Sequence, residues 1–539
     1  MSFVIGLLFL LALIAVIVFG IRFLTSKRDE QASGDLDLIA YGLLAIAVGT
    51  ATFAVAGLAG AAFPDQTIVG RGSSQAATAL AALVVAFPIA VVLWRRQALR
   101  RKQYPESVGW ALYLAVIEAV FMTATVVAAV SLLYWLIGTG DAAPWSNLII
   151  FGGVIALHDF AQARTPAGSD AAGLSRVVGS VIGLITTAVG VGMLLYGLFS
   201  EIYGSFAATV NDFELAAAVS LVIVGAPVWF FRWWLPWSFE PKGPRKVWLT
   251  IASVSGLLTA LGSGVAIVIS LVVFMFGDAA PAEEHFEFVP VALAVLIVAE
   301  AIWFLHRRRI GSERTNTRRS YEYFMTAFAL VSVVTSATAL AAVAFSEFDI
   351  VGPGDASVPW SIAVVLLVSL ATWWWFWSKA QAAPRELEAK ATPRRVYLLG
   401  LALIVGLTAA EALIGTLVVV FQQLMDSGGS SQTLAIQASL FVFSGLTTWH
   451  LLRVNSQDKK LFEAEEVIAP FQVTVVCSHP GQLATVLPKQ ANVRILYRAD
   501  EVGIVDDEMA EDIATAIGQT SALVWVGAGG FEVAPARFD

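Results

Sequence analysis

The chain has 539 residues, of which 58% are hydrophobic and only 14% are charged. Soluble domains carry about 25% charged residues, so this composition excludes an ordinary soluble protein and predicts a polytopic membrane protein. The formal net charge is −8, and the single cysteine, Cys477, excludes an internal disulfide or a cysteine-built metal centre.

Thirteen apolar segments each approach the roughly 20 residues that a helix needs to cross a bilayer. The first, 2–24, has no basic leader and is interpreted as a retained helix rather than a secretory signal. The other twelve form six hairpins, of which 145–161 is the weakest span. The hairpins are 38–62 with 74–95, 108–137 with 145–161, 175–203 with 213–235, 246–277 with 287–306, 319–346 with 359–378, and 395–425 with 433–453.

An internal repeat supports this division of the chain. An aromatic residue recurs near the start of five hairpins at steps of 69 to 76 residues, and Gly179 occupies the remaining position. The second helices often end in an aromatic and basic cluster such as Trp229-Phe230-Phe231-Arg232. Two interpretations stay open for these aromatics, a belt at the membrane interface and an aromatic cage for a ligand. The five aromatics near the hairpin starts are Tyr41, Trp110, Trp248, Tyr321 and Tyr397.

The distribution of basic residues predicts the orientation. Of the 33 lysines and arginines, 28 lie on the side where the hairpins start and end, and only Arg71 lies in the opposite loops. The positive-inside rule therefore places the first helix with its N-terminus outside and the C-terminus in the cytoplasm. The outer loops are acidic, which indicates either a soluble surface or weak binding of divalent cations.

Three carboxylates lie inside predicted spans, at Glu118, Glu300 and Glu411. A charge in hydrocarbon costs about 2.5–3.5 kcal/mol at the centre of a span, so such residues usually face the interior of a bundle. No lysine or arginine lies deep in a span, so these acids are expected to lack an ion-pair partner. They are interpreted either as neutral groups hydrogen-bonded to a neighbouring helix or as a proton or cation pathway.

The last part of the chain has a different character. The predicted organisation is a first helix and basic loop at 1–34, six hairpins at 35–455, a charged linker at 456–470 and a soluble α/β domain at 471–539. In that domain the pattern predicts strands at 471–476, 493–497 and 522–526, and helices at 481–487 and 506–517. Its excess of acidic residues argues against nucleic-acid binding.

Two turns follow strands of this domain and are candidate ligand sites. In a parallel sheet both would lie at the C-terminal edge, where α/β folds usually bind ligands. Cys477 beside His479 does not by itself make a nucleophile pair, and no catalytic motif, metal site or cofactor site is predicted. The candidate ligand residues are Ser478, His479 and Gly481 in the first turn, and Gly527 and Gly529 in the second.

The hairpins resemble a known family. Two of them open on Arg-x-x-[Tyr/Trp]-Leu, at Arg245-Lys246-Val247-Trp248-Leu249 and Arg394-Arg395-Val396-Tyr397-Leu398, and later hairpins close on tryptophan-rich basic ends. This pattern over 35–455 resembles an uncharacterised family of bacterial multi-pass membrane proteins, described only as a domain of unknown function. The resemblance implies a multi-pass protein of the bacterial inner membrane and supplies no catalytic residue.

The sequence therefore predicts an all-α polytopic membrane protein of about 13 spans with a small C-terminal α/β domain. Two functions remain open. The first is a non-enzymatic membrane scaffold or sensor, whose cytoplasmic domain meets a protein partner or ligand. The second is a transporter or ion pathway that uses Glu118, Glu300 and Glu411. The expected surroundings are the lipid bilayer, without nucleic acid, and the oligomeric state is open.

Overall fold

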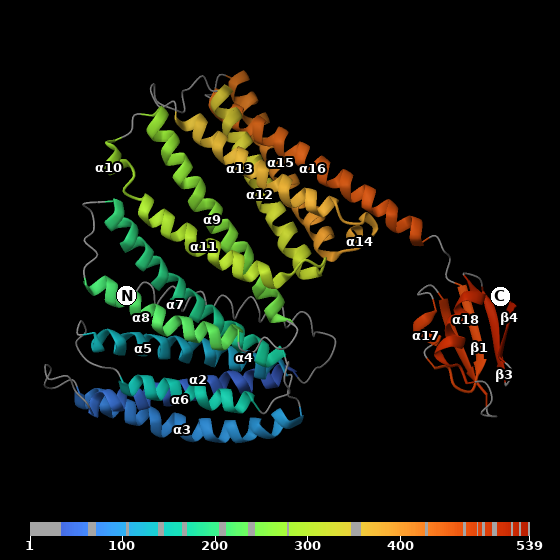
Figure 1. The fold of residues 1–539 in the computed structure, drawn as a ribbon, viewed down its shortest axis with the longest axis horizontal. Coiled ribbons are helices and arrows are strands. Elements are labelled where there is room, and N and C mark those ends of the chain that lie inside the picture. The colour runs from blue at the N-terminus through green and yellow to red at the C-terminus, as the bar shows by residue number, and fades with distance from the viewer. Residues whose placement is uncertain are drawn as a thin grey trace. The chain divides into compact units, whose positions relative to one another are not determined.

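The structure is a computed structural model that describes most of the chain between Gly34 and Ala536 (Figure 1). It divides into two units that are described separately. The first comprises the chain up to Ala380 together with Leu407–Ser444, and the second comprises Gln381–Gly406 and Gly445–Asp539. The described residues are 34–62, 72–103, 107–137, 145–163, 170–203, 212–234, 243–277, 280–345, 357–425, 430–466, 471–481, 483–487, 491–498, 504–518, 521–527 and 530–536.

Long apolar helices make up the N-terminal part, as the sequence predicts. Eleven helices of the described residues are long and apolar enough to span a bilayer, so the chain is a multi-pass membrane protein. The helices are α2 (Gly34–Ala62), α3 (Gly72–Gln103), α4 (Val108–Ile117), α5 (Thr123–Leu136), α6 (Trp145–Gln162), α7 (Asp170–Tyr203), α8 (Asp212–Trp229), α9 (Pro244–Phe276), α10 (Ala282–His285), α11 (Val289–Ile310), α12 (Asn316–Phe345), α13 (Ser357–Gln381), α14 (Arg385–Ala389), α15 (Thr392–Leu424) and α16 (Ser431–Glu466). Two π-helical turns, η1 (Glu118–Met122) and η2 (Phe230–Trp234), continue α4 into α5 and end α8.

Two of the thirteen predicted spans are not among these eleven. The first, 2–24, lies outside the described residues. The second, 145–161, forms the helix α6, but its 18 residues are about 27 Å long at 1.5 Å per residue. Its last turns also carry His158, Asp159 and Gln162, which lower its apolar character.

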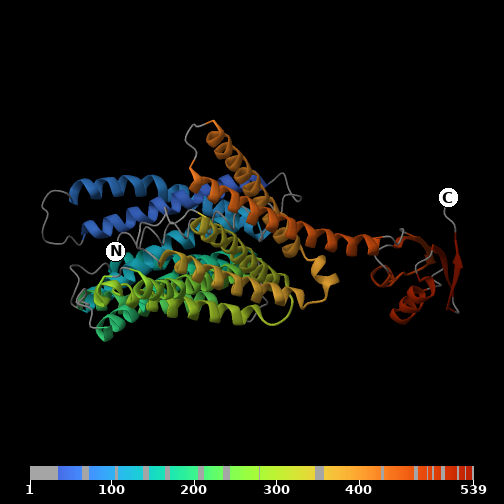
Figure 2. The same ribbon diagram turned by 90° about the horizontal axis from the view of Figure 1, so that it is seen from above.

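Consecutive helices pack as hairpins. The closest pairs are α2 with α3, α7 with α8, and α9 with α11, and α2 and α3 lie side by side in both views (Figures 1 and 2). First helices of neighbouring hairpins are in contact, as α4 is with α2 and α7, and α9 is with α12, and α7 also contacts the second helix α11. Aromatics near hairpin starts also contact the ends of other second helices, as Trp110 does with Trp94. This is the arrangement expected when the hairpins enter the membrane from one side.

Small residues bring α7 and α8 close together. A Cβ atom on Gly183 would overlap the backbone of Trp229, and one on Gly190 would lie 2.9 Å from the carbonyl oxygen of Ala218. Glycine allows such close approach of membrane helices. In contrast, a Cβ on Gly192 would meet no atom within 4 Å.

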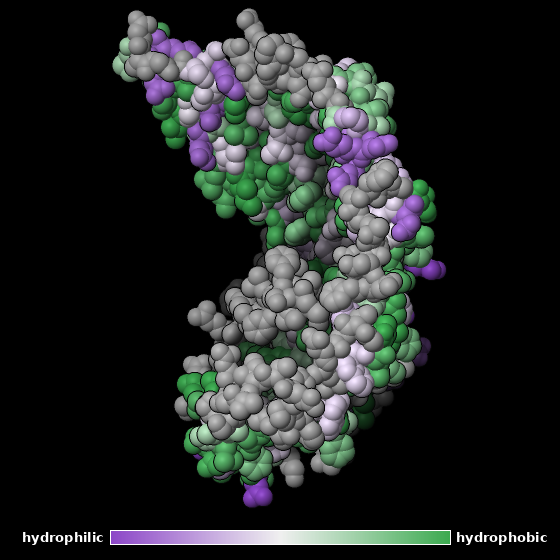
Figure 3. Space-filling view, turned by 90° about the vertical axis from the view of Figure 1, so that its left-hand side faces the viewer, coloured by the Kyte–Doolittle hydropathy of each residue, from purple (hydrophilic) through white to green (hydrophobic). Residues whose placement is uncertain are grey.

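The outside of the helices is apolar, as contact with lipid requires. Large hydrophobic side chains on α3 and α15 are exposed, including Val84, Phe87 and Leu403. Figure 3 shows one face of the molecule, on which hydrophobic residues cover much of the visible helix surface.

The second unit contains the start of α15 and the end of α16, joined by a buried ion pair. The Nε atom of Arg394 donates to Oδ2 of Asp458 at 2.6 Å, and both side chains are almost fully buried. The segment predicted as a charged linker, 456–470, belongs to the helix α16 as far as Glu466. Asp458 opposite Arg394 holds this polar stretch against α15, and its residues are good helix formers.

The C-terminal domain has the predicted strands and helices and one further strand. A four-stranded sheet has the order β2-β1-β3-β4, in which β1 (Phe471–Cys477) is parallel to β2 (Ala491–Tyr497) and to β3 (Ala522–Gly527). The unpredicted strand β4 (Gly530–Pro535) pairs antiparallel with β3. The helices are α17 (Leu483–Val486) and α18 (Asp507–Ile517), which is capped by Asp506. Buried Val473, Val524 and Ile513 belong to the domain's own core.

Candidate functional site

The repeated aromatic position lies between helices rather than on the lipid-facing surface. All five of its aromatics are buried, although other aromatics of the terminal clusters, such as Trp375 and Trp449, are exposed. Tyr321 accepts a hydrogen bond from the indole of Trp303 at 2.8 Å. The belt interpretation therefore suits the exposed aromatics, and the repeated position is instead a packing site. The five are Tyr41, Trp110, Trp248, Tyr321 and Tyr397.

The sixth position, Gly179, leaves room for charged side chains. A Cβ atom there would overlap Oε1 of Glu118 and would lie 3.0 Å from Cγ of Arg232. In the other hairpins an aromatic ring occupies this position. In the third hairpin a carboxylate of α4–η1 and a guanidinium of η2 pack against the bare backbone of α7 instead.

Arg232 joins two carboxylates from the preceding hairpin. Its Nε lies 2.9 Å from Oε1 of Glu118, and its Nη1 donates to Oδ1 of Asp159 at 2.7 Å. The Glu118 side chain is 5% exposed and that of Asp159 is 41% exposed, so the cluster extends from the interior to the surface. Arg176 also interacts electrostatically with Glu118. Two acids and two arginines therefore balance in formal charge.

Both members of the buried pair lie in π-helical turns. Glu118 is the first residue of η1, and Arg232 is the third residue of η2. A π-helical turn has one more residue than an α-helical turn, which rotates the side chains that follow, and such turns are frequent at functional sites. Pro227 lies in α8 shortly before η2 and removes a backbone donor from that helix.

The expectation that the buried acids lack an ion-pair partner is wrong for Glu118. Arg232 lies near the end of its hairpin, where its sequence context indicates the membrane interface. Its long side chain reaches inward because Gly179 leaves the space open. The sequence signals that could have found the cluster were Asp159 at the end of the weakest span and the missing aromatic at Gly179.

The other two candidate glutamates are placed differently. The side chains of Glu300 on α11 and Glu411 on α15 are exposed on their helices. Neither is among the charged groups that act on Glu118. The structure therefore does not join the three acids into one buried group, and the described residues contain no cluster of histidine, cysteine and acidic side chains that could hold a metal ion.

Two histidines near hairpin ends occupy similar aromatic surroundings. In the neutral ring, Nδ1 of His158 donates to the carbonyl of Val154 and Nε2 accepts from the hydroxyl of Tyr113, each at 2.7 Å. Nδ1 of His306 likewise donates to the carbonyl of Ile302 at 2.8 Å. Its Nε2 has no hydrogen-bond partner among the described residues.

The candidate turns of the C-terminal domain lie at one edge of its sheet. Because β1 and β3 are parallel neighbours, Ser478, which follows β1, and Gly527, which ends β3, lie at the same edge of the sheet. Gly481 has a φ of 53°, and a Cβ there would overlap the carbonyl oxygen of Val505. The exposed His479 pairs through its backbone with Ile504. Gly529 lies outside the described residues.

Two findings limit the chemistry of this edge. The helix that follows the first turn, α17, is a single turn of four residues, so its dipole offers little to an anion. Cys477 is buried in the core of the domain, and burial raises the pKa of its thiol. Deprotonation of the thiol is therefore disfavoured, which argues against a reactive thiolate beside His479.

Two segments of the chain are similar to a family of unknown function. The model of a family described as a domain of unknown function (DUF5671) matches the chain twice, over residues 37–157 and 174–289. These two segments, which together make up less than half of the chain, are similar to that uncharacterised family. The first copy runs from α2 into α6, and the second from α7 to the first residue of α11. No curated protein and no solved structure matches the chain.

The positions of the two matched segments also bear on the buried ion pair. Glu118 lies in the first copy of the domain and Arg232 in the second, so their contact joins the two copies. The pair does not recur at the spacing of the repeat. The repeat step from Trp110 to Trp248 is 138 residues. The residue one step after Glu118 is Gly256, and the residue one step before Arg232 is Trp94, so neither charged residue has a charged counterpart in the other copy.

Proposed function

We propose that this chain is a non-enzymatic membrane scaffold or sensor, in which the helical hairpins form a fixed platform and the C-terminal α/β domain meets a protein partner or ligand. One observation carries the proposal. The most deeply buried of the three candidate acids, Glu118, is paired with an arginine of the other domain copy. An acid held in this way serves to orient two hairpins, whereas an ion pathway needs a group that is able to release and rebind its ion.

The alternative is a proton or cation pathway. It is favoured by the π-helical turn at Glu118 and by the way in which the cluster runs from this buried acid to the half-exposed Asp159. Both features are compatible with a route for ions from the basic side of the membrane. Glu300 and Glu411 add nothing to such a route, because their side chains are exposed on other helices.

Flux measurements separate the two functions. The purified full chain is reconstituted in liposomes that contain a pH-sensitive dye, and a pH gradient is imposed. The scaffold proposal expects the gradient to decay as slowly as in empty liposomes, with or without Glu118→Gln. Rapid decay that Glu118→Gln abolishes and Glu300→Gln preserves would instead establish the pathway, since Glu300 is an acid of the same type outside the cluster.

The proposed orientation places the basic side and the C-terminal domain in the cytoplasm of a bacterial cell, with the protein in the inner membrane. A cysteine placed at Ser312, between α11 and α12, should resist a membrane-impermeant maleimide in intact cells. One placed at Ser430, before α16, should react. The background is Cys477→Ser, because Cys477 is the native cysteine and is buried. Labelling of Ser312→Cys from outside would show that the orientation is the opposite of the one proposed.

A further inference from the structure

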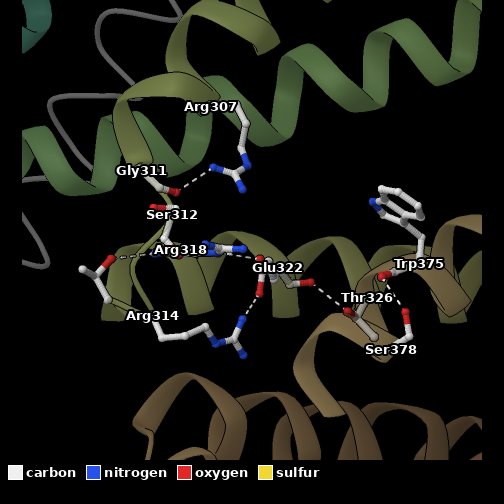
Figure 4. Close-up of polar contacts among 10 residues, drawn as sticks. Arg307, Gly311, Ser312, Arg314, Arg318, Glu322, Thr326, Trp375 and Ser378 are labelled. Atoms are coloured by element: carbon white, nitrogen blue, oxygen red, sulfur yellow. Dashed lines mark hydrogen bonds and ion pairs between the residues drawn. The ribbon is translucent and has the colours of Figure 1, made fainter. Parts of the chain in front are cut away.

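The junction of α11, α12 and α13 carries a concentration of basic side chains around one acid. Arg314 and Arg318 both form ion pairs with Glu322, which is buried on α12 (Figure 4). Nε of Arg318 donates to Oε1 of Glu322 at 2.8 Å, and its Nη1 also donates to the carbonyl of Ser312. Glu322 thus holds two guanidinium groups in fixed positions at the start of α12.

Two further cations lie beside this ion-pair group. Arg307 donates to the carbonyl of Gly311 at 3.0 Å, and its guanidinium carbon is 5.7 Å from the centre of the Tyr321 ring. Nζ of Lys379, on α13, is 4.2 Å from the centre of the Trp375 ring. Lys379 interacts electrostatically with Arg307, Arg318 and Glu322, so these four cations and Glu322 form one group. This basic junction, which is made up of Arg307, Arg314, Arg318, Lys379 and Glu322, has an excess of three positive charges.

The surroundings of the basic junction are those of a membrane interface. Its residues lie at the ends of three apolar spans, 282–310, 316–345 and 357–381. Large aromatic side chains are exposed beside them, namely Phe304 on α11 and Trp374 and Trp375 on α13. Exposed aromatics at helix ends lie at the level of lipid headgroups. The excess positive charge therefore faces the layer in which lipid phosphates are found.

The contacts show which cations are available to an anion. Glu322 already neutralises part of the charge of Arg314 and Arg318. Arg307 and Lys379 are held differently, since Arg307 donates to a neutral carbonyl and both groups lie over aromatic rings. Neither contact supplies a negative charge, and both leave donors of these groups for a phosphate. A headgroup phosphate between Arg307 and Lys379 would neutralise one of the three excess positive charges.

We infer that the basic junction binds the headgroup of an anionic phospholipid, with Arg307 and Lys379 contacting the phosphate and Glu322 positioning the two remaining arginines. Each basic group near an anionic surface contributes about 1 kcal/mol, or about fivefold in affinity. Removal of both contacting cations should therefore weaken binding by about thirtyfold. This inference does not depend on the proposed function.

Native mass spectrometry of the full chain released from detergent micelles tests the inference. The probes are dioleoylphosphatidylglycerol and dioleoylphosphatidylcholine, which differ in net charge and share their acyl chains. The wild type should retain phosphatidylglycerol preferentially, and the double variant Arg307→Gln/Lys379→Gln should lose that preference. The charge-preserving variant Arg307→Lys/Lys379→Arg should keep it, which distinguishes loss of charge from loss of fold.

A matched control comes from another hairpin. Arg453 lies 5.3 Å from the centre of the Trp449 ring, the same type of contact as that of Lys379, and Arg453→Gln should leave the preference unchanged. An equal loss in Arg453→Gln would overturn the inference, because it would show only a general attraction to the basic side. Displacement of phosphatidylglycerol by millimolar inorganic phosphate would also overturn it, in favour of a site for a free anion.

Discussion

Replacing Arg232 with glutamine should lower the stability of the protein more than any other single change in the charge cluster. The substitution leaves Glu118 and Asp159 without their shared guanidinium, and Glu118 stays buried. Removal of one partner from a buried ion pair typically costs about 3–5 kcal/mol. Glu118→Gln should cost less, because Arg232 keeps its contact with Asp159. Unfolding in mixed micelles with rising sodium dodecyl sulfate, followed by tryptophan fluorescence, measures both.

The double variant Glu118→Gln/Arg232→Gln gives the interaction between the two groups directly. Residues in direct contact usually couple by about 0.5–3 kcal/mol, so the double variant should be more stable than the sum of the single effects predicts. Glu300→Gln is the control, as an exposed acid outside the cluster, and should change stability little. Strict additivity of the Glu118 and Arg232 effects would show that the pair does not stabilise the contact between the two domain copies.

Replacing Gly183 with alanine should produce the second large effect. The new methyl group would overlap the backbone nitrogen of Trp229 and would lie 2.8 Å from its Cα. Backbone atoms are unable to rotate away as a side chain does, so α7 and α8 would have to separate. Forcing additional volume into a packed contact costs about 1–3 kcal/mol. The same micelle titration should show this loss, with the protein unfolding at a lower fraction of dodecyl sulfate.

Gly192→Ala is the matched control on the same helix. A Cβ at Gly192 meets no atom within 4 Å, so the substitution adds only helix propensity. Alanine is favoured over glycine inside helices by about 1 kcal/mol, so Gly192→Ala should be neutral or stabilising. If Gly183→Ala were equally neutral, the close approach of α7 to α8 would be in doubt, and with it the position of Arg232 beside Glu118.

The C-terminal domain shows where sequence reasoning succeeds. Its strands have short apolar segments bounded by turn residues. The helix at Asp507–Ile517 is capped by Asp506, whose side chain accepts a hydrogen bond from the backbone nitrogen of Met509 at 2.8 Å. These are local signals, and the first three strands and this helix were all predicted from them. The strand Gly530–Pro535 was missed, because its residues form a strand by pairing with Ala522–Gly527 rather than through a strong pattern of their own.

The sequence by itself determined that this is a multi-pass membrane protein of repeated hairpins, because the length and apolar character of each span are local properties. Only the tertiary structure decided which polar groups meet. Glu118, Asp159 and Arg232 come from three helices, and their contact depends on the absence of a side chain at Gly179. The repeat marks that position as unusual but does not show which side chains occupy the space. Charge pairing across helices is non-local, so it follows from packing and not from spacing along the chain.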